Sequence, residues 1–331
     1  PDQLLYYLKD RSIYSYNLTT DQHQKLTNPN LKVLEFKLAP PSNEIYFFAT
    51  TENVISRNAY LTDYQELFKL NLENLKVKKL AAAGKFVNFD FDVSPDGFTY
   101  ALMRAEIKYK TLHNRGITIF SKDAPPKKLW FDKIVDAPIF ISPFSDSLLG
   151  NAYDTGFSVV PLSLNPNRVQ QLGTFFDTFG FTPDAQKIVF TELLQDQSEQ
   201  IVIINSEGKK EVLNTSHSPD YLDLQNEGVY FSTNDDYSFA LYFYNFETQT
   251  IQEILSPTSS NSFEVFDVSP TKNFLAVETF AINEDAGLGS KARTFKENLE
   301  NTFQNAKIQI VSLEDSSIHG SFSGRYPQFA N

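Results

Sequence analysis

The sequence predicts an all-β fold, a seven-bladed β-propeller with four-stranded blades. Three observations predict it. A short turn motif recurs along the chain with strand-like runs after it, the chain is rich in aromatic residues (30 Phe and 16 Tyr), and its two ends together complete one further copy of the motif. Aromatic side chains favour pleated sheets, and repeated four-stranded units are the building blocks of propellers.

The motif is most complete at 91–97, which reads FDVSPDG. Proline presets φ for a turn, and Asp and Gly suit the positions after it, so each copy predicts a strand, a tight turn and a second strand. Proline also marks the end of a strand, because it cannot donate inside a central one. The related copies are Phe266-Asp267-Val268-Ser269-Pro270, Phe181-Thr182-Pro183-Asp184, Ile141-Ser142-Pro143, Leu38-Ala39-Pro40 and the degenerate Leu224-Gln225-Asn226-Glu227-Gly228.

Two weaker apolar runs follow the second strand of each copy and complete the four strands of a blade. Examples are 117–120 with 128–130, 200–204 with 210–213, and 239–244 with 251–255.

The seventh copy is divided between the termini. Joined end to start, they read QFAN-PDQLLYYL, which matches FDVS-PDGFTYAL. We therefore expect one domain, 1–331, whose closing blade combines 1–30 with 323–331 and takes its first strand from the C-terminus. The turn positions 1, 40, 95, 143, 183, 226 and 270 are 39 to 62 residues apart around the chain, against about 40–50 for a typical blade.

The repeat resembles the WD-like SPDG propeller repeats of the periplasmic Tol-system propeller and of related bacterial surface propellers. The resemblance covers the whole chain, but the motif is complete only at Ser94-Pro95-Asp96-Gly97. The Gly-His and Trp-Asp pairs of true WD repeats are missing, and the one Trp is Trp130. The resemblance implies a propeller fold, and it implies function only weakly because propellers include both binding modules and enzymes.

Composition excludes several classes of function. A net charge of −12 argues against nucleic-acid binding. No apolar run is long enough for a membrane span, although an anchor upstream of Pro1 is left open. With no Cys in the chain, disulfides, thiol catalysis and Cys-ligated zinc are excluded.

Three long insertions are expected between the second and third strands of their blades, at 50–65, 104–116 and 281–306. They would share one face and flank the closing blade, and long loops of this kind are often functional. In the last insertion, 290–305 predicts a short helix with an apolar stripe of Phe295, Leu299 and Phe303. The stripe either packs on the propeller rim or docks a partner.

These insertions carry basic and aromatic residues on an otherwise acidic chain, a pattern that suits a carboxylate, an acidic peptide or an anionic glycan. The alternative is an ordinary solvated face. The candidate binding residues are Arg57, Tyr60, Tyr64, Arg104, Lys108, Tyr109, His113, Arg115, Lys291, Arg293 and Phe295.

The sequence contains no catalytic signature that we recognise. The four His residues lack metal-ligand spacing, and Asp92-x-Ser94-x-Asp96-Gly97 mimics a calcium loop only at its start. Gly320-Ser321-Phe322-Ser323-Gly324 has Phe at the position of the nucleophile in a hydrolase elbow. We therefore predict no catalytic residue, no metal site and no cofactor.

The resulting functional prediction is a non-catalytic binding or scaffold propeller. It would recognise a protein or anionic glycan on the insertion face, in the periplasm or at the cell surface. One alternative is a hydrolase or lyase that processes a polysaccharide or peptide at the central channel. Another is an assembly subunit of a surface structure.

Overall fold

The computed structural model describes residues 4–50, 65–108, 111–130, 135–152, 156–161, 170–173, 179–194, 198–213, 215, 219–235, 238–258, 261–281 and 306–330. The regular elements in these ranges are strands, apart from one 3₁₀ turn, η1 (Pro40–Ser42). The predicted all-β class is therefore confirmed. No helix within the described ranges is long and apolar enough to cross a membrane.

The chain divides into two compact units. The four-sheet unit is Asn30–Leu213, and the three-sheet unit combines Pro1–Pro29 with Asn214–Asn331. Each sheet has four antiparallel strands that follow one another along the chain, except for the sheet that uses both termini.

The four-sheet unit contains four such meanders. The first is β4 (Lys32–Ala39), β5 (Glu44–Thr50), β6 (Glu66–Asn71) and β7 (Val77–Ala81). The second is β8 (Phe86–Val93), β9 (Thr99–Lys108), β10 (Thr111–Ser121) and β11 (Ala124–Trp130). The third is β12 (Val135–Ile141), β13 (Ser147–Ala152), β14 (Gly156–Pro161) and β15 (Gln170–Gly173). The fourth is β16 (Phe179–Phe181), β17 (Lys187–Leu193), β18 (Glu199–Asn205) and β19 (Lys210–Leu213).

The three-sheet unit contains two further meanders and the sheet built from both ends. One meander is β20 (Pro219–Leu224), β21 (Gly228–Asp235), β22 (Ser238–Asn245) and β23 (Thr250–Thr258). The other is β24 (Asn261–Val268), β25 (Phe274–Ala281), β26 (Ala306–Ser312) and β27 (Ile318–Ser323). The sheet of both ends is ordered β28 (Arg325–Phe329), β1 (Leu4–Lys9), β2 (Ser12–Asn17) and β3 (Gln22–Lys25).

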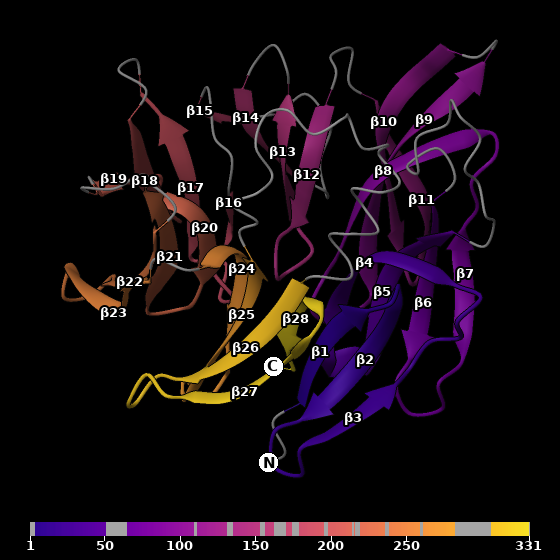
Figure 1. Ribbon diagram of the computed structural model, residues 1–331. Coiled ribbons are helices and arrows are strands. Elements are labelled where there is room, and N and C mark those ends of the chain that lie inside the picture. The colour runs from indigo at the N-terminus through magenta and orange to yellow at the C-terminus, as the bar shows by residue number, and fades with distance from the viewer. Residues whose placement is uncertain are drawn as a thin grey trace, which may run out of the picture. The chain divides into compact units, whose positions relative to one another are not determined.

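Pairing of the two termini is observed as the sequence predicted. Strand β28 runs antiparallel to β1, with Leu5 opposite Phe329 and Leu8 opposite Arg325 (Figure 1). Pro327 is tolerated in β28 because this strand is at the edge of its sheet and donates to only one neighbour.

Apolar side chains between successive sheets form the cores of each unit. Phe48 of the first sheet meets Phe91 of the second edge to face, with ring centroids 4.7 Å apart. Met103 packs with Ile141 between the second and third sheets, and Leu149 packs with Phe190 between the third and fourth. The four sheets are therefore stacked in chain order.

The predicted turns are present between the first and second strands. In the second sheet, Ser94 N–H donates to Thr99 O at 2.8 Å and Gly97 N–H donates to Ser94 O at 2.8 Å. Ser142 and Thr182 make the same backbone pattern in the next two sheets. The residue three positions after the Ser or Thr has positive φ each time, at Gly97, Ser145 and Ala185.

Neighbouring first strands are joined by carboxylates. Asp92 accepts from Ile141 N–H at 2.6 Å, Asp223 accepts from Val268 N–H at 3.0 Å, and Asp267 accepts from Phe329 N–H. The first strand of a sheet has one edge without a ladder partner, so these side chains satisfy backbone groups that would otherwise be unpaired.

One predicted insertion is wrong. Residues 104–116 were expected to be a loop, but β9 and β10 continue through most of this range as a hairpin, with Leu112 opposite Ile107 and His113 opposite Glu106. The alternation of buried positions persists into it, since Met103 and Ala105 are both fully buried. Residues 51–64 and 282–305, which hold the other two insertions and the predicted helix, lie outside the described residues.

A ring of seven blades is not part of what the structure shows, because its sheets belong to two units that are described separately. The blade count and the single domain 1–331 therefore stay predictions.

Candidate functional site

A groove of about 490 Å³ lies between the first two sheets of the four-sheet unit. One wall carries Tyr46 and Lys69 with Lys78, and the other carries Phe98, Tyr100 and Lys122. We call it the Tyr46 groove. It opens where the turns after β4, β6, β8 and β10 gather, and this end of the unit is called the turn face.

The second wall is positioned by the one complete SPDG turn. The Ser94 hydroxyl donates to the Asp96 carboxylate at 2.6 Å, and the same carboxylate accepts from Phe98 N–H at 2.9 Å. These bonds hold the turn tightly and leave the Phe98 side chain 52% exposed at the rim of the groove.

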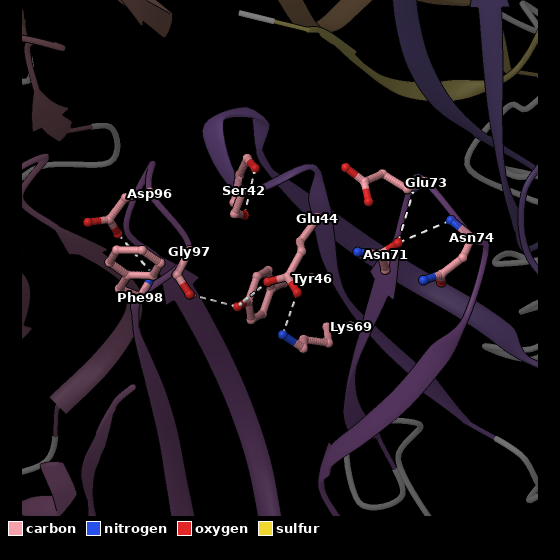
Figure 2. A network of polar contacts seen from close by, with 11 residues as sticks. Ser42, Glu44, Tyr46, Lys69, Asn71, Glu73, Asn74, Asp96, Gly97 and Phe98 are labelled. Carbon is pink, nitrogen blue, oxygen red and sulfur yellow. Dashed lines mark hydrogen bonds and ion pairs between the residues drawn. The ribbon is translucent and has the colours of Figure 1, made fainter. Parts of the chain in front are cut away.

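Gly97 allows this turn to contact the neighbouring sheet. Its φ is +70°, and a Cβ added there would come within 2.4 Å of Ser42 Oγ. The Tyr46 hydroxyl donates to Gly97 O at 2.9 Å (Figure 2). Only glycine combines this backbone conformation with such a close approach.

The floor of the groove is aromatic. Tyr100 and Phe120 are stacked with centroids 4.6 Å apart and planes inclined by 9°, and Tyr46 lies 5.8 Å from Tyr100. Burial raises the pKa of Tyr100 to about 12, and burial together with Glu44 raises the pKa of Tyr46. Both hydroxyls are therefore neutral near pH 7, and the hydroxyl of Tyr46 already donates to Gly97 O.

The charge in the groove is predominantly positive. Lys69 is paired with Glu44 (Figure 2). The ammonium group of Lys122 lies 4.5 Å from the centre of the Phe98 ring, and Lys78 is exposed. Among the residues that the structure describes, neither Lys78 nor Lys122 is paired with a carboxylate.

The turn between β6 and β7, at the same end of the first sheet, is held by an Asn side chain. Asn71 Oδ1 accepts from the N–H groups of Glu73 and Asn74, each at 3.1 Å (Figure 2). This local bonding fixes the start of β7, from which Lys78 reaches the groove.

The predicted site residues are placed elsewhere. Arg104 lies against the Phe86 ring at 3.6 Å, and burial lowers its pKa. Lys108 forms an ion pair with Glu106 at 2.9 Å, and His113 is exposed on β10. Arg115 is in β10, near the β9–β10 end of the sheet and away from the turn face.

The remaining seven predicted residues lie outside the described residues. These are Arg57, Tyr60, Tyr64, Tyr109, Lys291, Arg293 and Phe295. The expected basic patch as a whole is therefore untested. Its described residues do not form a common positively charged site, because Arg104 covers the Phe86 ring and Lys108 is paired with Glu106.

Sequence reasoning missed the Tyr46 groove because it interpreted the short turns as purely structural. One signal was present: the complete SPDG turn is followed directly by Phe98, a large apolar residue at a turn tip. The contribution of Tyr46 and Lys78 from another sheet has no sequence signal.

A second cluster of charges lies on the first strands. Lys37 of β4 is 3.0 Å from Asp92, and its ammonium group is also 5.0 Å from the centre of the Phe140 ring. Burial and the nearby Asp90 raise the pKa of Glu35 to about 7, although Lys37 opposes this. Within the described ranges, no three His, Asp or Glu side chains are arranged to hold a metal ion.

No protein-family model and no curated protein matches the sequence. The fold is similar to that of an oligogalacturonate lyase in complex with manganese, with a TM-score of 0.63 and 12% identity over 81% of this chain and 79% of that chain. The β-propeller domain of Cps50 (Swd1) from Myceliophteria thermophila has a TM-score of 0.55 and 10% identity over 88% and 85%.

TolB from Acinetobacter baumannii has a TM-score of 0.52 and 13% identity, and covers 78% of this chain. The chain spans 64% of that TolB chain. Identities this low show the fold alone, and the predicted β-propeller is thereby confirmed. The narrower SPDG repeat family stays a prediction.

Proposed function

We propose that the chain is a non-catalytic binding β-propeller. Its Tyr46 groove binds a ligand in which a carboxylate group is attached to a ring or to an apolar group. A segment of a partner protein and an anionic glycan both have this chemistry. The observation that carries the proposal is the placement of Lys78 and Lys122 in a groove that also has four aromatic side chains in its lining.

The geometry favours recognition over chemistry. Lysine ammonium groups attract a carboxylate, and the faces of Tyr100 and Phe120 suit a flat or apolar ligand surface. The raised pKa of Tyr46 leaves its hydroxyl as a donor that is already engaged by Gly97 O, so this group is poorly suited to act as a base.

Calorimetric titration with phenylacetate tests the proposal, with benzylamine as a ligand of similar size and opposite charge. We expect phenylacetate to bind and benzylamine not to bind. The double variant K78E/K122E should weaken phenylacetate binding by about tenfold, roughly 1.4 kcal/mol.

Lys85→Glu is the matched control. Lys85 is exposed and lies between β7 and β8, at the opposite end of these sheets. The proposal fails if phenylacetate does not bind, or if K85E weakens binding as much as K78E/K122E does.

The predicted insertion-face site stays a separate proposal. Charge reversal at Lys108 and Arg115, studied in the same titration, tests whether that part of the chain contributes.

A second candidate function is acid–base catalysis on the first strands, because the pKa of Glu35 near 7 suits a group that exchanges protons at neutral pH. The similarity of fold to an oligogalacturonate lyase suggests the first substrate to try. Incubation with trigalacturonate, followed by absorbance of an unsaturated product, should show turnover that is lost in E35Q, and no turnover in the wild type excludes this candidate for that substrate.

We further propose that the seven sheets close into one ring and that the protein functions in the periplasm or at the cell surface. Small-angle X-ray scattering tests the ring, since a closed ring and two independently moving units differ in radius of gyration. Cell fractionation with immunoblotting tests the location.

A further inference from the structure

A second, smaller groove of about 190 Å³ lies between the third and fourth sheets of the four-sheet unit. Phe144, from the turn after β12, is 67% exposed at this groove. We call it the Phe144 groove. Phe181, Ile188 and Ile204 add apolar surface to its lining, and Ser, Gln and Asn side chains add neutral polar surface.

Both grooves lie at the turn face. The Phe144 groove is bordered by the Ser142 turn and the Thr182 turn, which are built like the Ser94 turn beside the Tyr46 groove. The second and third sheets, which carry Phe98 and Phe144, pack directly on each other and are joined by the bond from Ile141 N–H to Asp92. Phe98 and Phe144 therefore lie on neighbouring sheets. The Tyr46 groove is on the far side of the sheet that carries Phe98, and the Phe144 groove is on the far side of the sheet that carries Phe144.

The two grooves differ in chemistry. The Tyr46 groove is basic and aromatic, whereas the Phe144 groove mixes apolar side chains with neutral polar ones and has no net charge, because Lys187 and Asp146 offset each other. An anionic glycan repeats its carboxylates along its length, so it would place one beside the exposed Phe144 ring in a groove that has no net positive charge. A peptide can place an acidic side chain in one groove and an apolar side chain in the other.

We propose that the turn face of the four-sheet unit binds an extended segment of a partner protein that combines acidic and large apolar residues. The segment sets a carboxylate between Lys78 and Lys122 and an apolar side chain against Phe144, and it crosses Phe98 between them. This inference rests on the proposed function of the Tyr46 groove and names the class of partner.

Selection from a phage-displayed library of short random peptides against the full chain tests the inference. We expect enriched peptides to share acidic residues at a constant distance from a large apolar residue. Phe144→Ser should weaken the enriched peptide by about tenfold and leave phenylacetate binding unchanged, whereas K78E/K122E should weaken both.

Ile318→Ser is the matched control, since Ile318 is 62% exposed at the start of β27 in the other unit and undergoes the same loss of apolar surface. Peptide binding that F144S leaves intact, or a selection without any acidic and apolar consensus, overturns the inference. Tight binding of trigalacturonate that depends on Lys78 and Lys122, with no peptide enriched, also overturns it and identifies the ligand as a glycan. If the wild-type protein does not bind phenylacetate, the proposed function itself is rejected instead.

Discussion

The Tyr46 hydroxyl donates a hydrogen bond to the backbone carbonyl of Gly97 across 2.9 Å, and this bond joins the second strand of one sheet to the turn of the next. It makes the complete SPDG turn a contact between sheets as well as a reversal of the chain. Four predictions follow from this contact and from the buried charges of the first strands.

Gly97→Ala should destabilise the protein by about 2–3 kcal/mol, because alanine at φ +70° is strained and its Cβ would overlap Ser42. The free energy of unfolding, from urea denaturation, measures this loss. Phenylacetate binding should weaken as well, since the turn forms one wall of the Tyr46 groove.

Gly208→Ala separates the two causes. Gly208 has φ +79°, but no atom lies within 4 Å of an added Cβ, so only the backbone strain applies. Equal losses in G97A and G208A would show that the contact with Ser42 contributes nothing.

Asp92→Asn should cost about 1–3 kcal/mol, because the amide can still accept from Ile141 N–H but no longer pairs with the mostly buried Lys37. Thermal or urea unfolding measures this. The Lys210–Glu192 pair is more exposed at its lysine, so Glu192→Gln should cost less than about 1 kcal/mol. If D92N lowers the free energy of unfolding by no more than E192Q does, the role given to the Lys37–Asp92 pair is contradicted.

Glu35 should make stability depend on pH. Its pKa is raised from 4.5 to about 7 in the folded protein, chiefly by burial, so the folded state binds its proton more tightly than the unfolded state does. The stability that this group contributes is fully present below about pH 4.5 and is lost as the pH rises through about 7. Lys37, Asp90 and Asp92 belong to the same cluster of charges as Glu35. These three residues are identical in the wild type and in E35Q.

Urea denaturation of the wild type and E35Q between about pH 5 and pH 8 should show a smaller fall in unfolding free energy for E35Q. Glu207→Gln, at an exposed turn position, is the control and should retain the wild-type slope. Identical slopes for the wild type and E35Q would refute the assignment.

Arg325 should hold the C-terminal strand in place. Its Nε donates to Glu278 at 2.5 Å, while the same carboxylate accepts from Tyr326 N–H at 2.8 Å. Arg325→Met removes the guanidinium group that pairs with the fully buried Glu278, at an expected cost of about 3–5 kcal/mol.

Hydrogen–deuterium exchange should then rise in β28 and in β1, which pairs with it. Arg325→Lys keeps the charge and should restore part of the protection. Unchanged exchange in β28 of R325M would show that the ladder with β1 alone retains the strand.

The turns and strands were predictable because their signals are local. Pro143 and Gly97 restrict or permit backbone angles by their own covalent structure, and the run of apolar residues in β5 or β9 can be read within one strand. Pairing of the termini was predictable for a similar reason, since the two halves of a repeated motif are recognisable when separated. The 104–116 hairpin was misread because charged residues at exposed strand positions resemble those of a loop.

The Tyr46 groove and the carboxylate contacts were not predictable in the same way. Asp92 and Asp267 occupy the same position in two copies of the repeat, and this regularity was a usable sign that the residue bonds to the next sheet. No such sign connects Lys78, Lys122 and Phe144 to binding.

The sequence by itself determined the all-β class, the turn positions and the use of both chain ends in one sheet, because each depends on residues that are adjacent or repeated. Only the tertiary structure decided which residues of different sheets meet, such as Tyr46 with Gly97 and Lys37 with Asp92, and that Lys78 and Lys122 line the same groove. Such contacts depend on how the sheets pack face to face, and that packing is set by many weak apolar contacts between residues far apart in the chain.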